Sequence, residues 1–131
     1  MTQDTLAGRR IGFIGAGNMA EAIIQGLLKS RTVAPDHITA SDVMPERLQQ
    51  MQTAYGINTT DDNAALVAGS DILVLAVKPQ VAGKVLHHIG PHTDDSKLVI
   101  SVVAGLTVAT MAAALGPGTR IVRTVPNTPV F

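Results

Sequence analysis

The chain has 131 residues, of which 46% are hydrophobic and 15% charged, and its formal net charge at pH 7 is zero. This length fits one domain, and the hydrophobic fraction excludes an intrinsically disordered chain. The balanced charge, without a basic cluster, argues against nucleic acid as the main partner, and the lack of cysteine excludes disulfides, thiol chemistry and Cys-ligated metals.

The N-terminal sequence MTQDTLAG lacks the apolar core of a signal peptide. The longest apolar runs, ILVLAV and LVISVVAGL, are far shorter than the roughly 20 residues of a membrane-spanning helix. We therefore expect a cytoplasmic protein with no membrane partner. A flexible N-terminus over residues 1–8 is expected to precede a dinucleotide-binding domain over residues 9–131.

Short runs of β-branched residues alternate with segments of helical length along the whole chain. Strands are predicted over residues 10–15, 37–41, 56–60, 71–77, 97–104 and 119–125, and helices over residues 18–30, 44–55, 61–69, 79–90 and 107–116. The fourth and fifth strands are continuously apolar, as parallel strands are when helices cover both faces. This alternation predicts an α/β fold: a doubly wound, mainly parallel sheet of the Rossmann type.

The first strand ends in a glycine turn that opens the first helix. Gly15, Gly17 and Ala20 form the pattern G-x-G-x-x-A. In this pattern the first glycine allows a tight turn, the second lets a pyrophosphate approach the backbone, and the alanine lets the helix pack close to the strand. The amides of the first helical turn then face the phosphates. The alternative is a tight structural turn in a sheet that binds another ligand.

The second strand ends at Asp42, where Rossmann domains place a residue that contacts the adenosine ribose. A carboxylate there accepts hydrogen bonds from the ribose hydroxyls and repels a 2′-phosphate, which favours NAD over NADP. Ser41 is an alternative contact, Arg47 is one helical turn further on, and Asp42 itself is alternatively a cap of the next helix. The cofactor is therefore expected to be NADP or NAD.

No catalytic or metal-binding constellation stands out, and no metal is expected. Hydride transfer needs little acid–base chemistry from the protein, because the cofactor supplies the reacting bond. The acidic pairs at positions 61–62 and 94–95 are interpreted as helix-cap and loop charges. The four histidines are expected at the surface: His37, His87, His88 and His92.

Four stretches, in this order and spacing, carry a resemblance to a known family: GFIGAGNMAEAI, LAVKPQ (75–80), SVVAG (101–105) and VRTVPNTP (122–129). They resemble the N-terminal half of the pyrroline-5-carboxylate reductases, which reduce a cyclic imine to L-proline in proline biosynthesis. The resemblance runs from Arg10 to Val130. More distant relatives with the same nucleotide domain are the 6-phosphogluconate and 3-hydroxyisobutyrate dehydrogenases.

The resemblance implies a cofactor site at the carboxyl ends of the strands. The implied contacts are Ile14, Gly15, Ala16, Gly17, Asn18 and Met19 at the pyrophosphate, Ser41 and Asp42 at the ribose, Asn63 at the adenosine, Ala76, Val77, Lys78 and Pro79 at the nicotinamide ribose, and Val102, Val103 and Ala104 at the nicotinamide. Asn127 and Thr128 are implied at the edge of the substrate pocket. Lys78 is either a general acid or a positioning residue, and no catalytic residue is assigned. Family members often carry Cys, Ala or Ser at positions 102 and 103.

In the family, an all-helical domain follows, which forms the homo-oligomer and supplies the site for the substrate carboxylate. The resemblance therefore predicts that this sequence is a fragment. It is expected to bind the dinucleotide, to reduce pyrroline-5-carboxylate poorly or not at all, and to expose an apolar patch around residues 125–131. Two alternatives stay open: an oxidoreductase acting on another imine or on a hydroxyacid, and a non-catalytic module that senses redox state or binds a protein partner.

Overall fold

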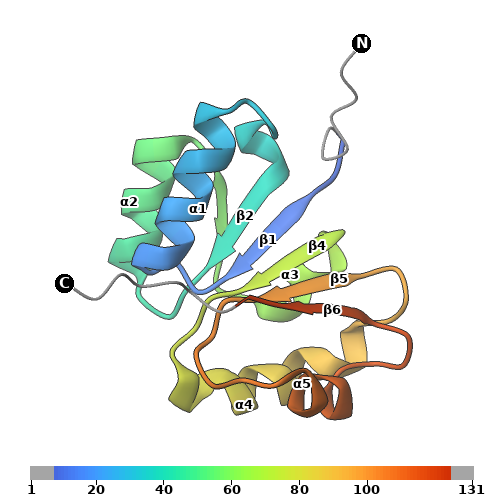
Figure 1. Ribbon diagram of the computed structural model, residues 1–131. Helices are drawn as coiled ribbons and strands as arrows, with labels where there is room; N and C mark the ends of the chain where they lie inside the picture. The colour runs from blue at the N-terminus through green and yellow to red at the C-terminus, as the bar shows by residue number, and fades with distance from the viewer. Residues whose placement is uncertain (1–7, 125–131) are drawn as a thin grey trace, which may run out of the picture.

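A computed structural model describes residues 8–124, which form a six-stranded sheet with helices on both faces (Figure 1). The strands are β1 (Ile11–Ile14), β2 (Ile38–Ser41), β3 (Asn58–Thr60), β4 (Ile72–Leu75), β5 (Leu98–Ser101) and β6 (Arg120–Arg123). The helices are α1 (Asn18–Lys29), α2 (Pro45–Tyr55), α3 (Asn63–Ala68), α4 (Pro79–Ile89) and α5 (Val108–Ala114). Two short 3₁₀ turns are η1 (Pro35–His37) and η2 (Gly90–His92).

All five strand pairings are parallel, and the strand order is β3-β2-β1-β4-β5-β6. This is the order of doubly wound dinucleotide-binding sheets, so the predicted Rossmann-type fold is confirmed. The order reverses between β1 and β4, where such folds bind their ligands. The residues expected at 127 and 128, the apolar patch around 125–131 and all but Gly8 of the expected flexible N-terminus lie outside the described residues.

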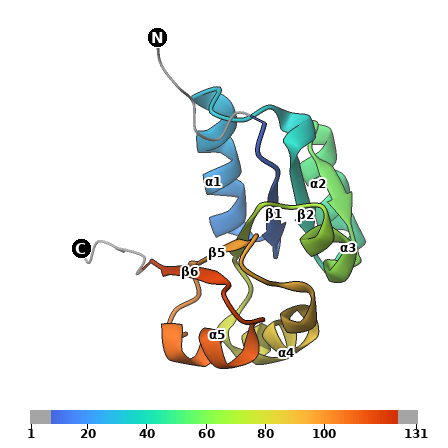
Figure 2. The same ribbon diagram turned by 90° about the vertical axis from the view of Figure 1, so that its right-hand side faces the viewer.

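Two apolar cores, one on each face, fix the helices to the sheet. The first core packs α1 and α2 against β1 and β2 and contains the fully buried Phe13, Ile24 and Met51. The second core packs α3, α4 and α5 against β4 and β5 and contains Leu73 and Leu86. Figure 2 shows α4 and α5 side by side, on the opposite side of the sheet from α1.

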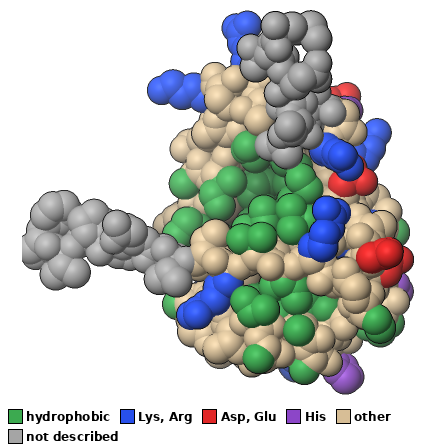
Figure 3. All heavy atoms as spheres, turned by 45° about the vertical axis from the view of Figure 1, so that its right-hand side comes forward, with side chains coloured by type: hydrophobic (Ala, Val, Ile, Leu, Met, Phe, Trp, Pro, Cys, Tyr) green, Lys and Arg blue, Asp and Glu red, His purple; other side chains and the backbone are tan. Residues whose placement is uncertain are grey.

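One half of the first face is left without a helix. Strand alternation directs Leu73 and Val99 to the second core, so their neighbours point to the α1 side. There Ile72, Leu98 and Ile100 are half-buried, and Figure 3 shows hydrophobic side chains gathered in a hollowed area of this face. Among residues 8–124, no helix is both long enough and apolar enough to cross a membrane.

Candidate functional site

The carboxyl ends of all six parallel strands lie along one edge of the sheet, and α1 begins at this edge (Figure 1). Beyond the strand ends, one further backbone hydrogen bond joins four of the five neighbouring pairs. The Gly15 N–H donates to Ser41 O (2.9 Å), Ala76 to Ile14 (2.9 Å), Val102 to Leu75 (3.1 Å) and Thr124 to Ser101 (2.9 Å). The loops that carry the predicted cofactor contacts therefore start from strand ends that are hydrogen-bonded to one another.

The two glycines of the turn are required for different reasons. Gly15 has φ +99°, and a Cβ there would lie 2.6 Å from the Ala76 carbonyl oxygen, so the fold itself demands glycine. Gly17 has φ −79°, and a Cβ there would meet nothing within 4 Å. The fold therefore leaves the exposed space in front of Gly17 open without needing a glycine to do so.

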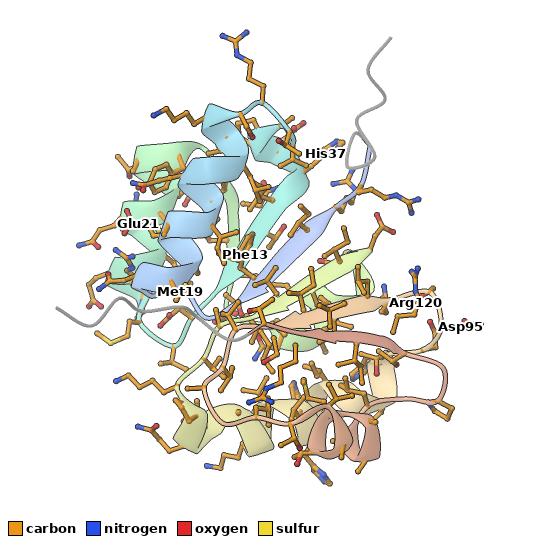
Figure 4. The ribbon with its side chains drawn as sticks, in the orientation of Figure 1. Phe13, Met19, Glu21, His37, Asp95 and Arg120 are labelled. Carbon is orange, nitrogen blue, oxygen red and sulfur yellow. The ribbon has the colours of Figure 1, made fainter. Side chains whose placement is uncertain are left out.

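The N-terminus of α1 offers unpaired donors to this open space. Gly17 is the N-cap, and no side chain caps the helix. The first helical bond runs from the Glu21 N–H to Gly17 O (3.0 Å), so the amides of the first turn have no acceptor within the helix. Met19 lies at this end of α1, whereas Asp95 and Arg120 lie at the opposite edge of the sheet (Figure 4).

Asp42 has a role that neither sequence interpretation described in full. Its Oδ2 accepts a hydrogen bond from the Ala16 N–H (2.9 Å), and its Oδ1 accepts one from the Met44 N–H (3.0 Å). The second bond lies just before α2, but the N-cap of this helix is Met44 and no side chain caps it, so the capping alternative is wrong. The first bond ties the end of β2 to the glycine turn. A carboxylate has about four acceptor positions, so capacity remains for ribose hydroxyls.

Arg47 holds the same turn from the other side. Its Nε donates to the Ala16 carbonyl oxygen, and its Nη2 donates to Glu21 Oε1 at 2.7 Å. Ala16 is fully buried, with its N–H on Asp42 and its C=O on Arg47. The turn therefore has its conformation fixed by two side chains from the β2–α2 unit.

Sequence reasoning missed Glu21 and Tyr55, which complete this network. The Tyr55 hydroxyl donates to Glu21 Oε2 and accepts from Gln25 Nε2 (2.7 Å), so α1 and α2 are joined where Glu21 lies between them (Figure 4). The hydrogen bonds from Tyr55 and Arg47 lower the pKa of Glu21. The bond to Glu21, and then burial, raise the pKa of Tyr55. These partners are 26 and 34 residues apart in sequence, so no local pattern points to them.

Ser41 and Asn63, which are expected at the ribose and adenosine of the cofactor, are hydrogen-bonded to each other. Ser41 is 3% exposed, and its Oγ donates to Asn63 Oδ1 at 2.5 Å. Asn63 is the first residue of α3, which Asp62 caps by accepting from the Ala64 and Ala65 amides. Ser41 is thus occupied within the protein, while Asn63 is half-buried at the edge.

The expected nicotinamide contacts divide into exposed and buried side chains. Lys78 is the exposed N-cap of α4, with Pro79 as the first helical residue, and Ala76 and Val77 are half-buried. Val102 is half-buried, whereas Val103 is 3% exposed and belongs to the second core. The buried side chains of Val103 and Ile14 are therefore turned to the core, and only the backbones of these two residues are at hand for a ligand.

Three of the four histidines and both acidic pairs are exposed, as expected. His87, His88 and His92 are exposed and His37 is half-buried, while Asp94 accepts from Ser96 in a loop. Among residues 8–124, no group of three or more acidic, His or Cys residues could hold a metal. Two shallow hollows, of about 180 and 120 Å³, lie away from the glycine turn, so the candidate site is an open edge.

Known proteins are similar to this chain in sequence and in fold. A family model described as NADP oxidoreductase coenzyme F420-dependent matches residues 10–105, which include the glycine turn and the ends of β2, β4 and β5. The chain belongs to this family.

Within the family, the chain is similar to pyrroline-5-carboxylate reductases, as the sequence predicted. It is 46% identical to one from Methanosarcina acetivorans over 93% of this chain and 45% of that protein. Solved reductases from Coxiella burnetii (35% identity, TM-score 0.85) and Plasmodium falciparum (30% identity, TM-score 0.78, with NADP bound) each match 92% of this chain, and 45% and 43% of their own chains. The chain therefore spans about half the length of the relatives it matches.

Proposed function

We infer that this chain binds a nicotinamide dinucleotide, NADH or NADPH, with its diphosphate at the start of α1. One observation carries this inference: Gly17 is exposed, its backbone is allowed for any residue, and the space in front of it is open beside unpaired amides. Helix N-termini with such amides bind phosphates through hydrogen bonds and the helix dipole. The NADP bound to the P. falciparum relative supports the same ligand class here.

The reaction that we propose is hydride transfer to 1-pyrroline-5-carboxylate, which gives L-proline. The similarity to reductases of that name over more than nine-tenths of the chain supports this substrate. A protonated cyclic imine is already electrophilic, so the protein's task is to hold the nicotinamide C4 against the imine carbon. Ala76–Pro79 and Val102–Ala104, at the ends of β4 and β5, are proposed to hold the nicotinamide half, and Asn63 to contact the adenosine.

The binding proposal is tested by Gly17→Val. The allowed backbone and open space predict that the variant keeps its fold, while the new side chain fills the position of the diphosphate. We expect NADH and NADPH affinity, measured by nucleotide fluorescence, to fall about a hundredfold, equivalent to about 2.8 kcal/mol.

The matched control is Gly26→Ala, in the same helix. Gly26 is exposed, and a Cβ there also meets nothing within 4 Å, but the position is two turns away from the N-terminus. This variant should bind both nucleotides like the wild type. Unchanged binding by Gly17→Val would show that the diphosphate does not lie at this turn.

The reaction is tested separately by proline formation from 1-pyrroline-5-carboxylate and NAD(P)H. Because the chain spans about half the length of the reductases it resembles, we expect nucleotide binding with slow turnover or none for these 131 residues. Turnover that matches a full-length reductase would contradict the expectation that substrate binding and oligomer formation depend on a second domain.

A further inference from the structure

We propose that Glu21 is a selectivity residue: it holds Arg47 on the glycine turn and so keeps this cation away from a 2′-phosphate. The inference rests on the proposed function, because it concerns which dinucleotide the same edge prefers. In this arrangement NADH, whose adenosine ribose carries a 2′-hydroxyl, binds more tightly than NADPH.

Arg47 is the cation whose placement decides the question. The residues between Asp42 and Arg47 are Val, Met, Pro and Glu, so Arg47 is the first basic residue after β2. Val43 is 94% exposed and Met44 55% exposed, so the chain directly after Asp42 presents apolar side chains to solvent. In the β2–α2 unit, a 2′-phosphate therefore has no other arginine or lysine close to Asp42.

Three of the five N–H donors of Arg47 are already engaged. Nε is on the Ala16 carbonyl, Nη2 is on Glu21 at 2.7 Å, and Nη1 is 3.3 Å from Gln50 Oε1. An arginine binds phosphate best when one edge of its planar fork offers two parallel N–H groups. Each of its three nitrogens already donates to another acceptor, so only one N–H on Nη1 and one on Nη2 are left for a phosphate.

The charges around the glycine turn disfavour a further anion. Asp42 and Glu21 contribute two negative charges against the single positive charge of Arg47. The bonds from Tyr55 and Arg47, which lower the pKa of Glu21, keep its carboxylate ionised at neutral pH. Tyr55 and Gln25 also hold Glu21 in its place, so the tie to Arg47 is supported by α1 and α2 together.

The test measures NADH and NADPH dissociation constants, by nucleotide fluorescence, for the 131-residue chain and for Glu21→Gln. The substitution keeps the shape of the side chain, removes its charge and weakens its hold on Arg47. We expect the affinity for NADPH relative to NADH to rise about tenfold, as one charge-assisted hydrogen bond is gained. High salt should reduce this rise, because it screens the charges.

Glu46→Gln is the charge-matched control. Glu46 is exposed, directly precedes Arg47, and makes no side-chain hydrogen bond to a described residue. Glu46→Gln removes the same charge without releasing Arg47, so the affinity for NADPH relative to NADH should change less than about twofold. An equal rise in both variants would mean that overall charge, and not the hold on Arg47, sets the preference, which would overturn the proposal.

Arg47→Ala provides a second decision that does not depend on Glu21. Because Arg47 supports the turn but does not meet a 2′-phosphate in the wild type, both affinities should fall together and their ratio should stay within about twofold. A selective loss of NADPH affinity would overturn the proposal. In the double variant Glu21→Gln, Arg47→Ala, the tenfold rise should be absent.

The outcomes separate this inference from the proposed function. If the wild-type chain binds neither nucleotide, the proposed function fails and the inference with it. If it binds both but prefers NADPH, or if Glu21→Gln leaves the ratio unchanged, only the inference fails. The ionisation of Tyr55, which should move to lower pH in Glu21→Gln, shows independently that the tie has been lost, and urea unfolding shows that the variant is folded.

Discussion

At the scale of single residues, we expect alanine substitutions at Gly15 and Gly26 to change the free energy of unfolding in opposite directions. Alanine at Gly15 would combine a φ of +99° with a contact of 2.6 Å to the Ala76 carbonyl, so we expect a loss of at least about 2 kcal/mol in the free energy of unfolding. Alanine at Gly26, an exposed position within α1, should raise the free energy of unfolding by about 0.5–1 kcal/mol. Urea unfolding measures both, and changes of the same sign would contradict the account of the turn.

Thr93 is the buried polar residue whose removal should cost most. Its Oγ1 donates to Gly90 O and accepts from the Gly116 N–H, both at 2.8 Å, and its side chain is nearly inaccessible. Thr93→Val keeps the shape but leaves the Gly116 N–H without its partner, while Gly90 O keeps only the Thr93 N–H at 3.1 Å, so we expect a loss of about 1–3 kcal/mol. Thr93→Ser keeps the hydroxyl and should lose less in the same unfolding measurement; an equal loss would assign the effect to packing.

The turn itself was predictable from sequence, but the residues that fix it were not. The glycine spacing predicts the turn because only glycine adopts the backbone of Gly15. That Asp42 and Arg47 bind the two polar groups of Ala16 depends on where β2 ends beside β1, which is a property of the assembled sheet. The local cap at Asp62, which needs only neighbouring amides, was predictable from sequence and is confirmed.

At the scale of elements, the tie between α1 and α2 makes the chain sensitive to pH at both extremes. The lowered pKa of Glu21 means that its contribution to stability is complete above about pH 4.5 and is lost as the pH falls through its folded value. The raised pKa of Tyr55 means that its contribution is complete below about pH 10 and is lost as the pH rises through its folded value.

Tyr55 is the one tyrosine of the chain, which has no tryptophan, so ultraviolet absorbance follows its ionisation directly. We expect a midpoint above pH 10 in the wild type and a lower midpoint in Glu21→Gln, because the hydrogen bond to the carboxylate is the first cause of the shift. Equal midpoints would show that the phenol and the carboxylate are not joined in solution.

All six strands and all five α-helices were predicted, whereas some of their ends were not. The fifth strand was expected to reach residue 104, but it ends at Ser101 because the Val103 N–H turns back to Ser101 Oγ (3.1 Å) and Gly105 adopts φ +77°. The η1 and η2 turns were also not expected. Apolar residues continue past the strand end, so hydropathy alone extends the strand too far.

At the scale of the whole molecule, the two faces of the sheet are covered unequally. Val99 of β5 is fully buried in the second core, whereas Val122 of β6 is 45% exposed. We expect Val99→Ala to lower the free energy of unfolding by about 1–3 kcal/mol and Val122→Ala by less than about 1 kcal/mol. Similar losses in urea unfolding would mean that another part of the protein covers the β6 side.

The whole fold could be predicted because every level of the sequence agrees. Alternating strands and helices, continuously apolar β4 and β5, and one glycine turn are consistent only with a doubly wound sheet. The hollow face could not be predicted in the same way, since the residues on it, Ile72, Leu98 and Ile100, look in sequence like any other core residues. Their exposure follows from all three later helices crossing on the other side.

Asp42 and Arg47 bind the N–H and the C=O of Ala16, and this has a consequence for how a ligand binds. The backbone of the glycine turn is preorganised before any nucleotide binds, so binding costs little backbone conformational entropy. The association rate should then be limited by diffusion and not by a conformational change. The backbone of the turn should superimpose closely between the nucleotide-bound and the free protein. Because the backbone of the turn is already fixed, the side chains that surround it are left to discriminate between ligands.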